Sequence, residues 1–139
     1  MKRFITPLFL AAAGGIAIVI GAAILFIPRA FFATSQIILE SNPSLMSEIR
    51  APGGLLLVAG LFILAGGFVR RLTEPALMIV AIGFGAYGSA RLISIAVDGL
   101  PSGSLVFATI LELACAVLAT ILIVRRQNTA THRHDGVSI

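Results

Sequence analysis

Four long apolar runs alternate with short polar segments along the chain. The runs cover residues 4–27, 52–69, 75–97 and 105–124. Each is close to the ~20 residues that a helix needs to cross the hydrocarbon core of a bilayer. Because short loops favour antiparallel neighbours, the pattern predicts an all-α integral membrane protein, an up-down four-helix bundle forming one domain over residues 1–126.

The first run begins like a signal peptide, because Lys2 and Arg3 precede it. It is, however, longer than the roughly 7–15 apolar residues of a signal peptide's central region. We therefore interpret the run as a retained membrane anchor rather than a cleaved leader.

The segments outside the runs carry helix signals of their own. Asn42 followed by Pro43 is typical of a helix start, so we expect a short interfacial helix over residues 43–50, between the first and second runs. Thr73 is a candidate N-cap for the third run, and Ser102 or Ser104 for the fourth. Residues 127–139 are polar and without hydrophobic period, which predicts a mobile tail.

Lysine and arginine predict the orientation. If all four runs cross, one side holds most of the basic residues, namely Lys2, Arg3, Arg70, Arg71, Arg125, Arg126 and Arg133. The other side holds only Arg29 and Arg50. Because cytoplasmic loops carry the excess of positive charge, both termini are expected in the cytoplasm.

Composition supports a membrane protein and excludes other classes. The chain is 58% hydrophobic and only 12% charged, with a mean hydropathy of +1.06, whereas about a quarter of the residues of soluble domains are charged. The net charge of +4 comes mostly from the arginines that set orientation. No basic face with an aromatic platform is visible, so no nucleic-acid partner is expected.

Two residues of opposite charge, Arg91 and Glu112, lie inside the third and fourth runs. At ~1.5 Å per residue, Arg91 lies about 10 Å below Asp98 and Glu112 about 12 Å below Ser104, so their depths match. A lone charge near mid-membrane costs roughly 2.5–3.5 kcal/mol, which favours an ion pair between them. Arginine and carboxylate can pair through two parallel hydrogen bonds.

Further polar residues continue from this pair toward the predicted external end. Tyr87, Ser94 and Asp98 share one helix face with Arg91, because the spacings are four, three and four. Two interpretations stay open. The pair is an internal clamp, or it lines an outward-facing polar pocket that binds a ligand, quinone or lipid head group, or passes a small solute or proton. That pocket would include Arg50, Arg91, Asp98 and Glu112, with Glu48 nearby.

Small residues recur at helical spacing, which marks helix faces that pack closely in membranes. The recurring sets are Gly53, Gly60 and Gly67; Ala13, Ala17 and Gly21; and Ala81, Gly85 and Ser89. Packing within the bundle is the main interpretation. Contacts in a homo-oligomer or a larger membrane complex, through the three glycines at 53, 60 and 67, are the alternative.

Catalytic motifs are scarce. The single Cys115 excludes a disulfide within one chain and is interpreted as a packing residue. His132 and His134, two residues apart on the polar tail, are weak evidence for a metal site. No phosphate-binding loop, nucleophile elbow or His-Glu zinc motif occurs. We therefore expect no catalytic residue, metal or cofactor, and favour a non-enzymatic protein over an enzyme acting on lipid.

One set of residues is similar to a known family. These are Glu48 to Gly54, Gly88 to Arg91, Ser94, Asp98 to Ser102, and Glu112 with Leu113. From Glu48 to about Thr120, and more loosely in the first run, the chain resembles the small bacterial membrane proteins of domain of unknown function 4345. The resemblance implies a four-helix protein of the bacterial inner membrane. It matches the charged positions Arg50, Arg91, Asp98 and Glu112 but assigns them no task.

Overall fold

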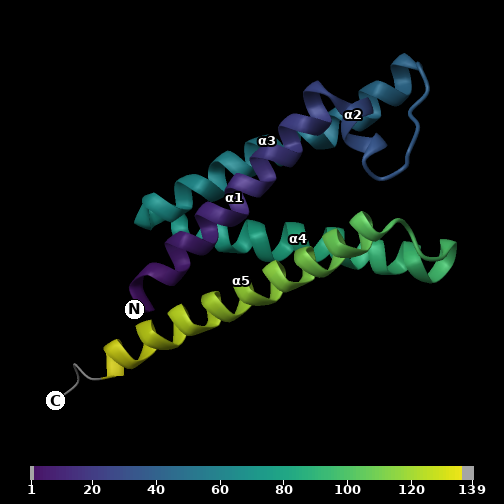
Figure 1. The fold of residues 1–139 in the computed structure, drawn as a ribbon. Helices are drawn as coiled ribbons and strands as arrows, with labels where there is room; N and C mark the ends of the chain where they lie inside the picture. Colours follow the sequence, from purple (N-terminus) through teal and green to yellow (C-terminus); the bar gives the residue numbers. More distant parts are fainter. Residues whose placement is uncertain (1, 136–139) are drawn as a thin grey trace.

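The structure, a computed structural model, is mainly helical in the part of the chain that it describes, with non-helical connections between some of the helices. The backbone is described for residues 2–135, and the side-chain surroundings for residues 4–128. The elements in chain order are α1 (Lys2–Phe26), α2 (Pro28–Ala33), α3 (Pro43–Phe68), the 3-10 turn η1 (Arg70–Leu72), α4 (Thr73–Asp98) and α5 (Gly103–Asp135) (Figure 1). Four of these helices, α1, α3, α4 and α5, are long and apolar enough to cross a membrane. The predicted all-α class with four span-length helices is confirmed.

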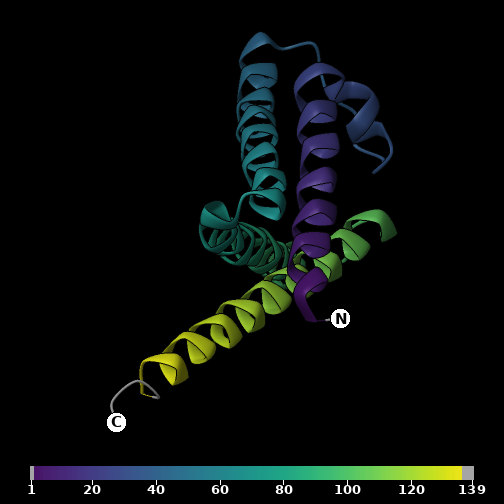
Figure 2. The same ribbon diagram turned by 90° about the vertical axis from the view of Figure 1, so that its left-hand side faces the viewer.

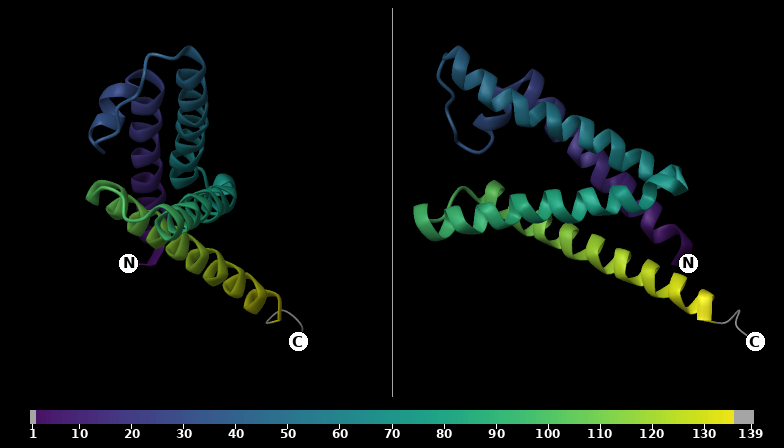
Figure 3. Two further views of the ribbon diagram at one scale, coloured as in Figure 1. Left: turned by 90° about the vertical axis from the view of Figure 1, so that its right-hand side faces the viewer. Right: turned by 180° about the vertical axis from the view of Figure 1, so that it is seen from behind.

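The four long helices form two antiparallel hairpins. α1 pairs along its length with α3, and α4 pairs with α5. The hairpins meet where α3 leads through η1 into α4, and they diverge toward α2 and the α4–α5 turn (Figures 1 and 3). Seen from the side, the α1–α3 hairpin stands across the α4–α5 hairpin (Figure 2). The up-down order is as predicted, but the helices do not run parallel as one bundle over their whole length.

The common core lies at the end where the hairpins meet. It contains Leu10 and Ala13 of α1, Ile63 of α3, Ala76, Leu77 and Val80 of α4, and Ala119 and Leu122 of α5. All four long helices therefore contribute to it. At the diverging end, a hydrogen bond of 3.1 Å between Ser35 Oγ and Ser104 Oγ links the loop after α2 to the start of α5.

Glycines bring the backbones of α1 and α3 into close contact. A Cβ added to Gly60 would lie 2.7 Å from the backbone nitrogen of Ile18, and one added to Gly67 would lie 3.0 Å from the carbonyl oxygen of Pro7. Gly53 is buried against Ile24. These three glycine positions therefore face α1 of the same chain. Contacts in a homo-oligomer or a larger membrane complex through these glycines stay a prediction.

α3 begins earlier than the apolar run predicts. Asn42 Oδ1 accepts hydrogen bonds from the backbone nitrogens of Ser44 at 2.9 Å and Leu45 at 3.3 Å, which caps a helix starting at Pro43. The helix continues through Pro52, which has no backbone N–H to donate to the carbonyl oxygen of Glu48, so one helical hydrogen bond is missing there. The expected separate helix over residues 43–50 is thus the first part of α3. The short helix that stands alone is α2, with Pro28 in its first turn.

Two other boundaries differ from the predictions. Thr73 is not the N-cap of α4, because Leu72 holds that position. Instead, the buried Thr73 Oγ1 donates to the carbonyl oxygen of Gly66 at 2.9 Å and satisfies an unpaired group at the end of α3. α5 continues to Asp135, so the predicted tail is helical that far, since neither proline nor glycine interrupts the sequence before Gly136. Residues 136–139 of that tail lie outside the described residues.

Candidate functional site

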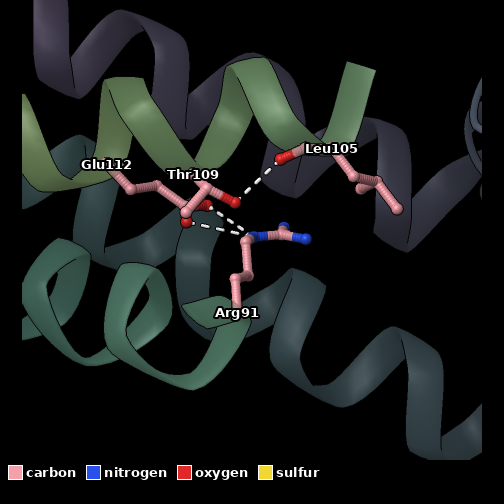
Figure 4. A network of polar contacts seen from close by, with 4 residues as sticks. All are labelled: Arg91, Leu105, Thr109 and Glu112. Atoms are coloured by element: carbon pink, nitrogen blue, oxygen red, sulfur yellow. Dashed lines mark hydrogen bonds and ion pairs between the residues drawn. The ribbon is translucent and has the colours of Figure 1, made fainter. Parts of the chain in front are cut away.

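Arg91 of α4 and Glu112 of α5 are in direct contact. Arg91 Nε donates to Glu112 Oε2 at 3.0 Å and to Oε1 at 3.2 Å (Figure 4). The two side chains are 33% and 15% exposed, so the carboxylate is the better covered partner. The structure therefore brings together the two charged residues that were predicted to pair because their depths in the membrane match.

The geometry of this contact differs from the expected fork of two parallel bonds. One N–H group is shared between both carboxylate oxygens, and the terminal guanidinium nitrogens point away from Glu112 (Figure 4). Within residues 4–128, these terminal nitrogens of Arg91 donate no hydrogen bond. Arginine therefore retains donors that another group can occupy.

Small residues set the distance between α4 and α5 at this level. A Cβ added to Gly88, three residues before Arg91, would lie 2.7 Å from Leu113 Cδ2. One added to Gly85 would lie 3.6 Å from the Cβ of Ala116, which is an ordinary contact. Because Gly88 has no side chain, the helices approach closely enough for Arg91 to reach across to Glu112.

Thr109 is a polar neighbour of this pair that the sequence analysis did not select. Its side chain is buried, and Oγ1 donates at 2.9 Å to the carbonyl oxygen of Leu105 in the same helix (Figure 4). The signal for it was present, because Thr109 precedes Glu112 by three residues and so shares its face. Its hydroxyl proton is used locally, so Thr109 offers Arg91 and Glu112 only acceptor capacity.

The predicted polar stripe divides into two parts. Arg91 reaches across to α5, whereas Ser94 Oγ donates along α4 to Asp98 Oδ2 at 3.0 Å. Tyr87 is on the same helix with 46% of its surface exposed. Asp98 is exposed at the end of α4, where Gly99 with φ 95° terminates the helix. Only Arg91 of this stripe contacts Glu112.

Arg50 and Glu48 belong to the other hairpin. Arg50 lines a pocket formed by residues of α1 and α3, and that pocket contains no residue of α4 or α5. Glu48 is exposed near the start of α3. The structure therefore does not place Arg50 in one pocket with Arg91, Asp98 and Glu112.

Other candidate groups add little to the site. Cys115 is a half-buried free thiol on α5 that packs against the common core. Among the described residues, no three His, Cys, Asp or Glu side chains come together as a metal site. His132 and His134 lie in the last part of α5, and their side chains fall outside the described surroundings.

Comparison with known proteins identifies the family. The family model described as domain of unknown function (DUF4345) matches residues 5–123, which is most of the chain. The chain belongs to this family. No curated protein and no solved structure matches it at a significant level. The DUF4345 match spans all four long helices and includes Arg50, Arg91, Asp98 and Glu112, so the ion pair lies within the family's domain.

Proposed function

We propose that this DUF4345 protein is a non-enzymatic structural or accessory subunit of the bacterial inner membrane. Its helices form a packed unit, and the Arg91–Glu112 ion pair clamps α4 to α5. The contact between these two side chains carries the proposal, since it neutralises two charges within span-length helices. Left apart, each charge would cost roughly 2.5–3.5 kcal/mol at the bilayer centre.

The position of the pair supports a clamping role. The common core at the junction of the hairpins holds all four long helices together. Arg91 and Glu112 lie outside that core, on the part of the α4–α5 hairpin that extends beyond the junction. There α5 has α4 as its principal neighbour, so an ion pair between the two helices contributes more to holding them together than it would inside the core.

The orientation proposed for this subunit places both termini in the cytoplasm. The turn η1, which carries Arg70 and Arg71, lies at the same end of the structure as the start of α1, whereas α2 and the start of α3, which carry Arg29 and Arg50, lie at the opposite end (Figure 1). The richer basic end is the cytoplasmic one under the positive-inside rule. The loop between α2 and α3 is then periplasmic.

Exchange of the two charged side chains tests the clamp. Arg91→Ala and Glu112→Ala are each expected to lower the yield of monodisperse protein in a mild detergent, because each leaves the other charge without its partner. The double variant Arg91→Glu with Glu112→Arg is expected to restore part of that yield. Arg71→Ala, which removes an exposed arginine outside the pair, is the matched control. Full folding of both single variants would contradict the clamp.

A second function is favoured by one specific observation, the free terminal nitrogens of the half-exposed Arg91. A quinone or lipid head group can accept hydrogen bonds from these nitrogens while Nε keeps its hydrogen bonds to Glu112. Arg91→Lys separates the two functions, since it keeps the charge but removes the planar fork. A ligand site predicts that this variant folds normally and no longer binds a short-chain quinone added as a probe. A clamp predicts that quinone binding is undetectable even in the unchanged protein.

A further inference from the structure

Two pockets lie at the loop end of the α1–α3 hairpin, and neither is lined by Arg91 or Glu112. The larger, about 710 Å³, is lined by Leu25 of α1 and by Ser47, Arg50, Gly54 and Leu55 of α3, among others. The smaller, about 310 Å³, is lined by residues that include Phe26, Pro28 and Arg29. Met46 and Arg50 line both pockets, so the two are neighbours and are together called the loop-end pocket.

The loop-end pocket combines positive charge with an apolar wall. Arg29 and Arg50 are the only basic residues between the first and second apolar runs, and both line the pocket. Neither forms an ion pair with any carboxylate in the described part of the chain. Arg29 is held in place, because one terminal nitrogen donates to Ser41 Oγ at 3.0 Å. Glu48 is the nearest acid in sequence to Arg50, but it lines neither pocket.

The apolar wall continues from the arginines along the hairpin. Leu25 and Leu55 flank Gly54, and a Cβ added to Gly54 would meet no atom within 4 Å. The space beside Gly54 is therefore open, unlike that beside Gly53 on the neighbouring face, which Ile24 fills. The site thus presents two cations at the end of a span-length hairpin, beside an open apolar surface that includes Leu25, Gly54 and Leu55.

From this arrangement we infer that the loop-end pocket binds an anionic phospholipid. Arg29 and Arg50 hold the phosphate, and one acyl chain lies along Leu25, Gly54 and Leu55. Guanidinium groups bind phosphate oxygens through paired hydrogen bonds, and basic residues at a membrane surface attract anionic lipid. This inference is independent of the function proposed for Arg91 and Glu112, because the pocket contains neither residue.

Lipid binding to the full-length protein in a neutral detergent tests the inference. The delipidated protein is titrated with phosphatidylglycerol or with phosphatidylcholine, and the bound fraction is read by native mass spectrometry. We expect clear preference for phosphatidylglycerol. Arg29→Gln with Arg50→Gln should weaken its binding roughly 30-fold, since each arginine near a membrane surface is worth about a factor of five.

Two further variants separate a built site from general charge attraction. Arg70→Gln with Arg71→Gln removes the same charge from exposed positions at the other end, and it should leave phosphatidylglycerol binding unchanged. Gly54→Leu keeps all charges but fills the open space beside Gly54, and it should weaken binding by itself. Because Gly54 and both pocket arginines meet open space or solvent, these variants are expected to stay monodisperse.

Three results would overturn the inference. Equal binding of the two lipids would remove the selectivity, and equal losses in the two double-arginine variants would show charge attraction without a site. Displacement of the lipid by inorganic phosphate, together with unchanged binding in Gly54→Leu, would show that the pocket takes a free phosphate. In that case the acyl chain plays no part.

Discussion

Gly14 of α1 and Leu64 of α3 bring their backbones so close together that a single methyl group does not fit between them. A Cβ added to Gly14 would lie 2.6 Å from the backbone nitrogen of Leu64 and 2.9 Å from the carbonyl oxygen of Gly60. Since the obstructing atoms are backbone, they cannot turn aside as a flexible side chain can. The α1–α3 hairpin is therefore held by backbone proximity, the usual means of helix association in membranes.

Gly14→Ala is expected to destabilise the protein by about 1–3 kcal/mol, the usual cost of overpacking. Its neighbour provides the matched control, because a Cβ at Gly15 would meet nothing within 4 Å. Gly15→Ala should be neutral, or stabilise the helix by up to about 1 kcal/mol. Thermal unfolding in detergent measures both. Equal effects of the two substitutions would contradict the close contact.

Thr73→Val is expected to destabilise the junction between α3 and α4. The substitution keeps the shape of the side chain but removes the hydroxyl that donates to Gly66, leaving a buried carbonyl unpaired at a cost of about 1–3 kcal/mol. Thr73→Ser retains the hydroxyl and should lose less. If Thr73→Ser unfolds at the lower temperature of the two, packing of the methyl group and not the hydrogen bond decides stability here.

The positions of the four long helices follow from the sequence, but their ends do so less well. The length of an apolar run indicates how much of a helix can lie in the hydrocarbon core, whereas the ends of the helix depend on capping interactions outside it. The second apolar run begins at Pro52, yet the cap at Asn42 starts α3 at Pro43, nine residues earlier. In the same way, the tail has no hydrophobic period, but nothing in its sequence stops α5 before Asp135.

Which helix faces meet could be predicted only in part. Spacings of four and seven mark a close-packing face, but they do not say whether the partner is α1 or a second molecule. The structure assigns Gly53 and Gly60 to α1. The divergence of the two hairpins depends on how entire helix faces pack together, and no single residue in the sequence indicates it.

The candidate site was likewise predicted correctly in part. Arg91 and Glu112 were paired by counting depth from the α4–α5 turn, which works because the rise per residue of a helix is constant and the turn is short. Arg50 was assigned to the same site because it lies toward the same predicted membrane side. Depth alone does not fix lateral position, and the structure places Arg50 on the other hairpin.

The orientation of the helices predicts which positions can be labelled from outside. On a Cys115→Ala background, Glu40→Cys in the loop before α3 should react with a membrane-impermeant maleimide on intact spheroplasts. Asn128→Cys on α5 should react only after lysis. Both positions are exposed, so lack of space does not limit labelling. Labelling of Asn128→Cys alone would reverse the orientation, and labelling of both would contradict the three crossings by α3, α4 and α5 that are expected between the two positions.

The coupling between Arg91 and Glu112 tests the central claim most directly. A double-mutant cycle of Arg91→Ala, Glu112→Ala and the combined variant, followed by reversible unfolding in detergent, isolates the interaction of the pair. We predict a favourable coupling of about 1–3 kcal/mol, above the ~0.6 kcal/mol average for interhelical hydrogen bonds in membranes and below the 3–5 kcal/mol cost of breaking a fully buried pair. Additive losses, with no coupling, would show that the two side chains do not clamp α4 to α5.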